Sequence, residues 1–282
     1  MKSILADALP LAQTARADTA PQKQIAARKP GVLTAARRLL VQQIALLLVI
    51  LAVWEAAGAW LVDPFWSSRP SLIAERLWIL AGTGDLWIHL STTISEAGIG
   101  LAMGCGVGIA LGLLMARFDR ATRVAEPLFM GLYSLPRVAL APLFVLWFGI
   151  GLLAKVMMSF SMVVFVFVLN VLEGIRSLDR DPIDLLRTMR ASPWYIARRV
   201  LLPAVLPWIA AAFRIAVGLS LIGAVVGELI GSSSGLGWYI EKSAGQLDTT
   251  GVFAGIISLL IVAMVANLLV TLVFRKLTGW RQ

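Results

Sequence analysis

Charged side chains stand inside apolar stretches of this 282-residue chain, and they are its first candidates for chemistry. Glu96, Arg137 and Arg214 lie within such stretches, and Glu55 and Glu228 lie at the edges of others. A charge at the centre of a bilayer costs about 2.5–3.5 kcal/mol on insertion scales, so such residues are usually paired, interfacial or functional. Two interpretations stay open. In the first, the charged residues form structural pairs, for example Glu96 with Arg137 or Arg214. In the second, they line the path of a solute. Two arginines on such a path would suit an anion, although the glutamates weaken that inference.

Few of the residues that enzymes commonly use for catalysis occur in this sequence. His89 is the only histidine and Cys105 the only cysteine, so neither an intramolecular disulfide nor a cysteine metal site is possible. The phosphate-binding pattern GxxxxGK[ST] does not occur. We therefore expect no catalytic site, no metal and no cofactor. An intramembrane enzyme that relies on carboxylates and hydroxyls alone is the least favoured alternative.

A basic segment between two apolar runs, residues 181–207, reads DPIDLLRTMRASPWYIARRVLLPAVLP. Asp181 and Ser192 belong to the residue types that cap helix N-termini, and each precedes a proline, which is favoured at the first helical position. The sequence therefore predicts two short helices with a break at 190–192. Arg190 ends the first helix, where a left-handed residue is common and glycine is the least strained choice.

Each predicted helix in this segment has an apolar face. Ile183, Leu186 and Met189 recur at helical spacing in the first helix, and Trp194 and Leu201 do so in the second. The arginines fall on the other faces: Arg187, Arg190, Arg198 and Arg199. Two uses suit such a pair of helices. It lies on the bilayer surface with its arginines on acidic lipid, or it docks into a groove of a cytoplasmic partner.

The elements that position these residues are predicted to be membrane spans. The chain is 59% hydrophobic with a mean hydropathy of +0.84, which is more apolar surface than one soluble core can hide. A bilayer core of about 30 Å needs about 20 mostly apolar residues per helix. The segments that qualify are roughly 39–62, 88–116, 127–150, 155–175, 204–228 and 252–274. The predicted fold class is therefore all-α, a polytopic bundle of about six transmembrane helices.

Two domains are predicted from the change in composition. Residues 1–37 are polar and basic and are interrupted by prolines, which is typical of a disordered tail rather than a cleaved signal peptide. Residues 38–282 form the membrane domain, with a two-helix loop at about 181–203. Within that domain the span at 127–150 is the least regular, because two prolines interrupt it.

The distribution of basic residues predicts the orientation in the membrane. With the N-terminus inside, 19 of the 25 Lys and Arg residues fall on the inner side and four, including Lys155, on the outer side. This bias places both termini and the 181–203 loop in the cytoplasm. Glu228 then lies near the outer end of its span, where water can reach it. The basic residues are spread between spans, so the net charge of +9 does not indicate nucleic-acid binding.

A stripe of glycines occupies one face of the predicted second span. The stripe consists of Gly100, Gly104, Gly108 and Gly112, at four-residue spacing. One glycine per turn lets another helix approach backbone to backbone. We expect this helix to be internal, either for packing alone or as a surface that slides during a conformational change.

Three stretches of the chain resemble the permeases of binding-protein-dependent ABC importers. The signature loop of that family reads Glu-Ala-Ala, three residues, Gly-Ala, and then Leu-Pro. Here its positions are held by Asp184, Leu185 and Leu186, then by Arg190 and Ala191, and finally by Leu202-Pro203. LPRVALAPLFVLWFGIGLLAKV (135–156) and GELIGSSSGLGWYI (227–240) are similar to stretches of the sulfonate/taurine/nitrate class. The resemblance covers roughly residues 70–275.

The resemblance implies a permease subunit of an ATP-driven importer in the bacterial inner membrane. Such a subunit pairs with a second copy of itself in membrane lipid, docks on two cytoplasmic ATPase subunits and receives substrate from a periplasmic or lipid-anchored binding protein. It hydrolyses no ATP itself. The docking residues carried over are Asp184, Leu185, Leu186, Arg187, Met189, Arg190, Ala191, Ser192, Trp194 and Tyr195.

The resemblance leaves the substrate open between two classes. A small anion such as a sulfonate, taurine or nitrate is the first expectation, and a neutral or aromatic nutrient such as a vitamin or pyrimidine precursor is the alternative. A secondary transporter is the alternative from another class. It would predict an inverted internal repeat, and no clear repeat is visible in the sequence.

Overall fold

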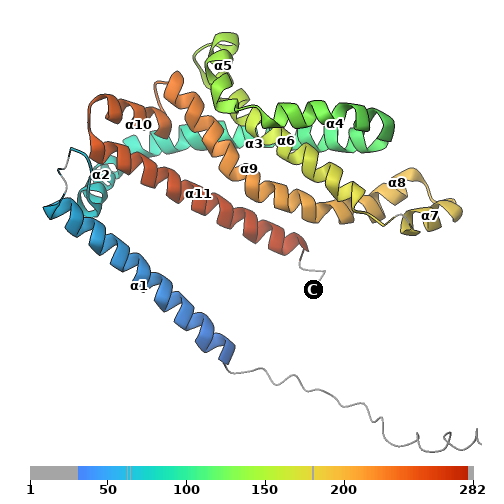
Figure 1. Ribbon diagram of the computed structural model, residues 1–282, viewed down its shortest axis with the longest axis horizontal. Coiled ribbons are helices and arrows are strands. Elements are labelled where there is room, and N and C mark those ends of the chain that lie inside the picture. The colour runs from blue at the N-terminus through green and yellow to red at the C-terminus, as the bar shows by residue number, and fades with distance from the viewer. Residues whose placement is uncertain (1–30, 62, 64, 180, 279–282) are drawn as a thin grey trace, which may run out of the picture. The chain divides into compact units, whose positions relative to one another are not determined.

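Helices make up all the regular structure of the described residues, which in this computed structural model are 31–278 without 62, 64 and 180 (Figure 1). The predicted all-α fold class is confirmed for this part of the chain. The predicted tail, 1–37, lies mostly outside the described residues. Its last part is helical, because the first helix, α1 (Gly31–Trp60), already begins at Gly31. Helix α1 therefore overlaps the last part of the predicted tail.

The chain divides into two compact units, residues 1–50 and residues 51–282. The described part of the first unit is residues 31–50 of helix α1, and the side chains of residues 37–50 are all exposed. Leu39, Ile44 and Leu48, for example, are each more than half exposed. A helix that is apolar on every side suits contact with lipid, and α1 is long enough to cross a bilayer.

Three long helices form the core of the second unit, where they lie side by side (Figure 1). They are α3 (Asp85–Arg117), α6 (Leu152–Arg176) and α9 (Leu202–Ile230). The helix α6 lies between the other two and contributes fully buried side chains such as Phe167, whose ring meets that of Phe213 edge to face with the ring centroids 4.9 Å apart. All three helices are long and apolar enough to be membrane spans.

The glycine stripe of α3 lies directly against α6. A Cβ atom added at Gly108 would lie 2.6 Å from the Cβ of Phe167, and one added at Gly112 would lie 2.8 Å from the Cβ of Val171. Real Cβ atoms do not approach so closely, so the backbones of the two helices pack at a distance that only glycine permits. This close approach explains why α3 and α6 are the most extensively packed pair of helices among the described residues.

The predicted third span is a broken helix. It consists of α4 (Asp119–Ser134), the short 3-10 helix η1 (Arg137–Leu140) and α5 (Ala141–Phe148), with a bend of 81° between its two halves. The cause is Pro136, which forces the preceding Leu135 into an extended conformation. The described residues hold five helices that qualify as spans, or six if this bent pair counts as one, which agrees with the predicted number.

Two short helices near one end of the bundle were not predicted as elements. They are α2 (Pro70–Thr83) and α10 (Leu236–Gly245), and both pack on the last helix, α11 (Thr249–Thr278). An ion pair of 2.6 Å joins Arg76 of α2 to Asp248 at the start of α11. We call this end of the second unit the α10 end, and the opposite end the α7 end (Figure 1).

The basic segment forms the α7 end. Its first helix is α7 (Asp181–Thr188), and its second begins as α8 (Pro193–Ile196). The second helix of the segment continues directly into the next span, because a π-helical turn, η2 (Ala197–Leu201), joins α8 to α9 in one helix of 38 residues. The wider turn accommodates Pro203, which has no N–H and whose ring would clash with the carbonyl one turn earlier.

Candidate functional site

The turn after α7 has the hydrogen-bond pattern of a Schellman motif. The amide of Ala191 donates to the carbonyl of Leu186 at 2.9 Å, and the amide of Arg190 donates to the carbonyl of Arg187 at 2.9 Å. Arg190 has a φ of 58°, in the left-handed region. The turn is therefore of the left-handed kind that is common at the end of a helix. Arg190 occupies the usual glycine position and carries a strain of about 1 kcal/mol.

A side-chain cap is present at the second of the two helix starts in the segment. Ser192 is extended, with ψ 150°, and its hydroxyl accepts a hydrogen bond from the amide of Tyr195 at 3.2 Å, as its predicted capping role requires. Asp181 is the first residue of α7 rather than a residue before it. The carboxylate that accepts a bond at this start belongs to Asp179, which is 3.2 Å from the Asp181 amide.

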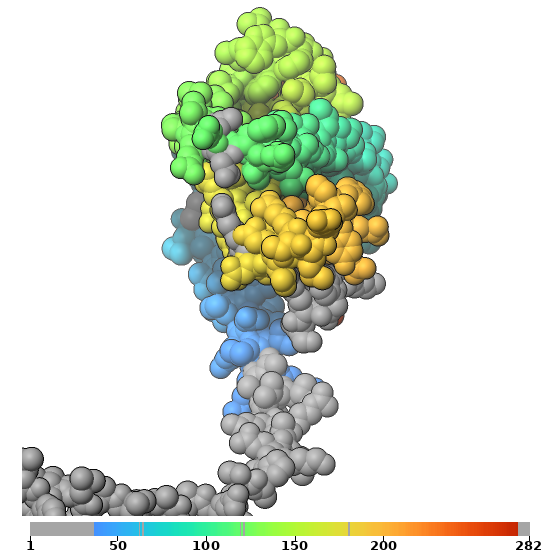
Figure 2. Space-filling model, turned by 90° about the vertical axis from the view of Figure 1, so that its right-hand side faces the viewer, coloured from blue at the N-terminus to red at the C-terminus, as the bar shows by residue number. Residues whose placement is uncertain are grey.

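Large apolar side chains of this segment face outward. Leu185 is 62% exposed, Met189 70%, Trp194 74% and Tyr195 48%, and we call these four side chains the α7–α8 surface. Figure 2 views the α7 end with this segment, in yellow and orange, in front. Ile196 is buried beneath it and anchors α8. A cluster of exposed apolar side chains on a structured loop is typical of a contact site.

The arginines of the segment surround the α7–α8 surface. Arg187 pairs with Asp184 at 3.1 Å, and the guanidinium of Arg199 lies 5.9 Å from the ring centre of Tyr195. Arg190 and Arg198 are exposed and have no hydrogen-bond or ion-pair partner among the described residues. Of the remaining predicted docking residues, Leu186 and Ala191 are half-buried below the surface.

The predicted partner of Glu96 is wrong. Glu96 forms an ion pair of 2.5 Å with Lys155, in which both side chains are almost completely buried. Lys155 had been counted in an outer loop, but it lies in the first turn of α6 and also donates to the hydroxyl of Ser232 at 2.9 Å. Because α3 crosses α6 here, this ion pair joins the two core helices at the α10 end.

Glu228 is buried, contrary to the prediction that water reaches it. Its carboxylate accepts hydrogen bonds from the Thr93 hydroxyl at 2.7 Å and from the Gly237 amide at 2.5 Å. Gly235, with a φ of 110°, lies against the same carboxylate where a side chain would not fit. The carboxylate therefore holds the start of α10 on the core.

Arg137 and Arg214 meet neither Glu96 nor each other. Arg137 is buried, with its guanidinium about 5 Å from the ring centres of Tyr133 (5.1 Å) and Phe165 (5.0 Å), and it donates to the carbonyl of Met162 at 3.3 Å. Arg214 is exposed on α9 and has no partner among the described residues. The three residues predicted for a solute path do not form one site.

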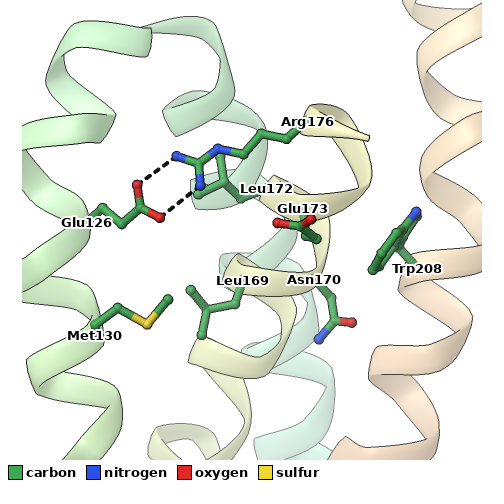
Figure 3. A pocket seen from close by; sticks show the side chains of 8 residues that line it. All are labelled: Glu126, Met130, Leu169, Asn170, Leu172, Glu173, Arg176 and Trp208. Atoms are coloured by element: carbon green, nitrogen blue, oxygen red, sulfur yellow. Dashed lines mark hydrogen bonds and ion pairs between the residues drawn. The ribbon is translucent and has the colours of Figure 1, made fainter. Parts of the chain in front are cut away.

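A cavity of about 290 Å³ opens between α4, α6 and α9 toward the α7 end (Figure 3). Its lining was not predicted and comprises Glu126, Met130, Leu169, Asn170, Leu172, Glu173, Arg176 and Trp208. Glu126 and Arg176 face each other across it in a two-pronged ion pair of 2.7 and 2.8 Å. Nothing in the sequence pairs these two residues, because they lie 50 positions apart on different helices. No group of three potential metal ligands occurs within the described part of the chain.

Comparison with known proteins gives a consistent result. A family described as "Binding-protein-dependent transport system inner membrane component" matches residues 108–279. Formylaminopyrimidine transport permease protein ThiX of Halalkalibacterium halodurans is 33% identical over 83% of this chain and 94% of its own. Putative aliphatic sulfonates transport permease protein SsuC of Bacillus subtilis is 33% identical over 83% and 85%. Taurine transport system permease protein TauC of Escherichia coli is 29% identical over 83% and 87%.

The fold is similar to that of a solved transporter chain. A chain of the MetNI methionine ABC transporter, in an inward-facing conformation, superposes with a TM-score of 0.56. It is 22% identical, and the match covers 71% of the present chain and 96% of the other.

Proposed function

The chain belongs to the family of binding-protein-dependent transport system inner membrane components, and on this premise we propose that a separate ATPase drives it through the α7–α8 surface. It is a permease of an ABC importer and a multi-pass inner-membrane protein. The observation that carries the proposal is the exposure of Leu185, Met189 and Trp194 on α7, on the turn after it and on α8, which Ser192 caps. Because α8 continues into α9 without a break, a displacement of this surface reaches the core through one helix.

The proposed assembly contains two copies of this permease, two cytoplasmic ATPase subunits and a periplasmic or lipid-anchored binding protein. ATP is hydrolysed by the ATPase subunits, since the sequence has no phosphate-binding GxxxxGK[ST] pattern. Family membership supports this assembly and gives no support to the secondary-transporter alternative.

Gentle purification of the intact chain from its native membrane tests the assembly. We expect an ATPase to co-purify, and uptake by the reconstituted complex to require ATP. Uptake that follows an ion gradient without ATP, in a preparation free of an ATPase, would contradict the proposal.

Both termini and the α7–α8 surface are proposed to lie in the cytoplasm, as the excess of basic residues on that side suggests. In a Cys105→Ala background, a membrane-impermeant maleimide should label Thr188→Cys of α7 only in inverted vesicles. Thr83→Cys, at the end of α2, should be labelled only in right-side-out vesicles. Both positions are exposed, so the reverse pattern would show the opposite orientation.

The strained Arg190 is proposed to be kept for a contact with the ATPase. Arg190→Gly removes the strain and should stabilise the turn by about 1 kcal/mol, yet it should lower the ATP hydrolysis that accompanies transport. Leu247→Gly is the matched control, because Leu247 has a φ of 56° and lies at the α10 end. It should stabilise the protein similarly and leave coupling unchanged. If Arg190→Gly leaves coupling unchanged or improves it, the contact does not exist.

The first candidate substrate is a small organic or inorganic anion. Two relatives are named for aliphatic sulfonates and taurine. The exposed Arg214 on the spanning helix α9 supports this candidate, because an unpaired cation within a span suits a passing anion.

The cavity favours a second candidate, a neutral aromatic nutrient. Its arginine is already paired with Glu126, and its other polar groups are the side chains of Asn170 and Glu173 beside the indole of Trp208. Such a lining suits a flat ring that carries N–H groups, and one relative is named for formylaminopyrimidine. Calorimetric titration of the captured binding protein with taurine and with an aminopyrimidine would decide between the two candidates.

A further inference from the structure

The helix α4 is only loosely attached to the core. Thr122 is its one buried side chain among those described, whereas Val124 is 76% exposed and Leu128 69%. The cavity separates α4 from α9 (Figure 3). A helix with few buried contacts is free to move relative to the core, so its remaining attachments decide which part of the protein it follows.

One of these attachments is the ion pair between Glu126 and Arg176. Both carboxylate oxygens of Glu126 accept from the two terminal nitrogens of the guanidinium, at 2.8 and 2.7 Å. This two-pronged geometry restrains direction as well as distance. The other described attachments of the broken helix are the Thr122 hydroxyl, which donates to the Met115 carbonyl at the end of α3, the ring of Phe129, which meets Phe165 at 6.0 Å, and Arg137.

The position of Arg176 links this ion pair to the α7–α8 surface. Arg176 is the last residue of α6, shortly before α7 begins at Asp181. Two residues earlier, Gly174 packs against the ring of Trp208, where a Cβ atom would lie 2.8 Å from the indole. The end of α6 is therefore packed on the first turns of α9. The chain between these two helices carries the α7–α8 surface.

We propose that Glu126 and Arg176 are positioning residues that tie α4 to the α7–α8 surface, so that an ATP-driven displacement of this surface also moves α4. The inference rests on the proposed docking of an ATPase at this surface. It adds a second route into the membrane domain beside the continuous α8–α9 helix. Movement of α4 changes the width of the cavity between α4 and α9, which makes the ion pair a determinant of coupling.

Charge reversal in the complete reconstituted complex tests this role. Glu126→Arg and Arg176→Glu should each lower the amount of solute imported per ATP hydrolysed by about tenfold. A loss of this size corresponds to the interaction energy that two residues in direct contact commonly share. The double reversal should restore the ratio to within about twofold of wild type. Partly exposed ion pairs contribute little to stability, so the thermal unfolding of all three variants should stay close to that of wild type.

A matched control is available at the other end of the bundle. The pair of Arg76 and Asp248 is exposed to a similar degree, 37% and 27% against 41% and 30%, and joins α2 to α11. Arg76→Glu should leave the ratio of import to hydrolysis unchanged. Glu126→Gln provides a milder variant should the reversals fail to fold, and it should lower the ratio in the same direction.

Three results would overturn the inference. They are an unchanged ratio in the single variants, a double reversal that does not recover, and a loss of coupling that only follows loss of folded protein. Failure of the docking proposal is recognised separately, because the ATPase would then remain bound when the α7–α8 surface itself is altered by Ala191→Glu.

Discussion

Ala191→Glu is expected to abolish uptake without preventing membrane insertion. Ala191 lies in the turn between α7 and α8, half-buried and next to the exposed Met189 and Trp194. Its amide closes the turn by donating to Leu186, and a substitution leaves this backbone bond in place. The new carboxylate would stand in the centre of the proposed contact, where apolar side chains of the permease meet the ATPase.

The expected effect of this substitution is large because the charge would be buried without a partner. Leaving a buried charge unpaired costs about 3–5 kcal/mol, which corresponds to a loss of affinity for the ATPase of more than about 100-fold. The measurement is co-purification of the ATPase together with ATP-driven uptake in proteoliposomes. It also separates docking from the lipid alternative, since a charge that only weakens contact with lipid would leave the ATPase bound.

Ala74→Glu is the matched control for this experiment. Ala74 is exposed on α2, at the end of the bundle opposite to the α7–α8 surface. The control variant should keep its ATPase and its uptake. Normal uptake by Ala191→Glu at normal expression would refute the docking assignment.

Lys155→Met is expected to destabilise the membrane domain by about 3 kcal/mol, because it leaves Glu96 buried and unpaired. The Lys155–Glu96 pair is 7% and 1% exposed, and Glu96 Oε2 already has no hydrogen-bond partner among the described residues. The lost ammonium also releases the Ser232 hydroxyl, which it now contacts at 2.9 Å. Without the ammonium group, the buried carboxylate of Glu96 at the α10 end of α3 and α6 has no counter-charge.

Thermal unfolding of the detergent-solubilised protein measures this loss. For a domain of this size about 3 kcal/mol corresponds to a midpoint lower by about 10 °C. Lys242→Met is the matched control, because Lys242 is exposed on α10, and it should shift the midpoint by far less. Adding Glu96→Leu to Lys155→Met should recover stability, since replacing a whole buried pair by apolar residues is often neutral. An unchanged midpoint in Lys155→Met would show that the pair contributes nothing.

Features that depend only on residues close together in the sequence could be predicted from it. The spans follow from long apolar runs, because each helix satisfies its own backbone hydrogen bonds within lipid. The cap at Ser192 and the strained turn at Arg190 follow from residue type and short-range order. The bend in the third span was indicated by its prolines, although its angle of 81° was not.

Features that depend on the register between helices were decided by the tertiary structure. Glu96 was expected to pair with an arginine, but the glycine stripe of α3 brings its helix so close to α6 that Lys155 is the nearest cation. Arg214, the other arginine considered, is exposed on α9. The pair of Glu126 and Arg176 joins helices that are not consecutive in the chain. The physical reason is that a sequence states which residues share a helix face, whereas the partner of that face depends on how the helices pack together.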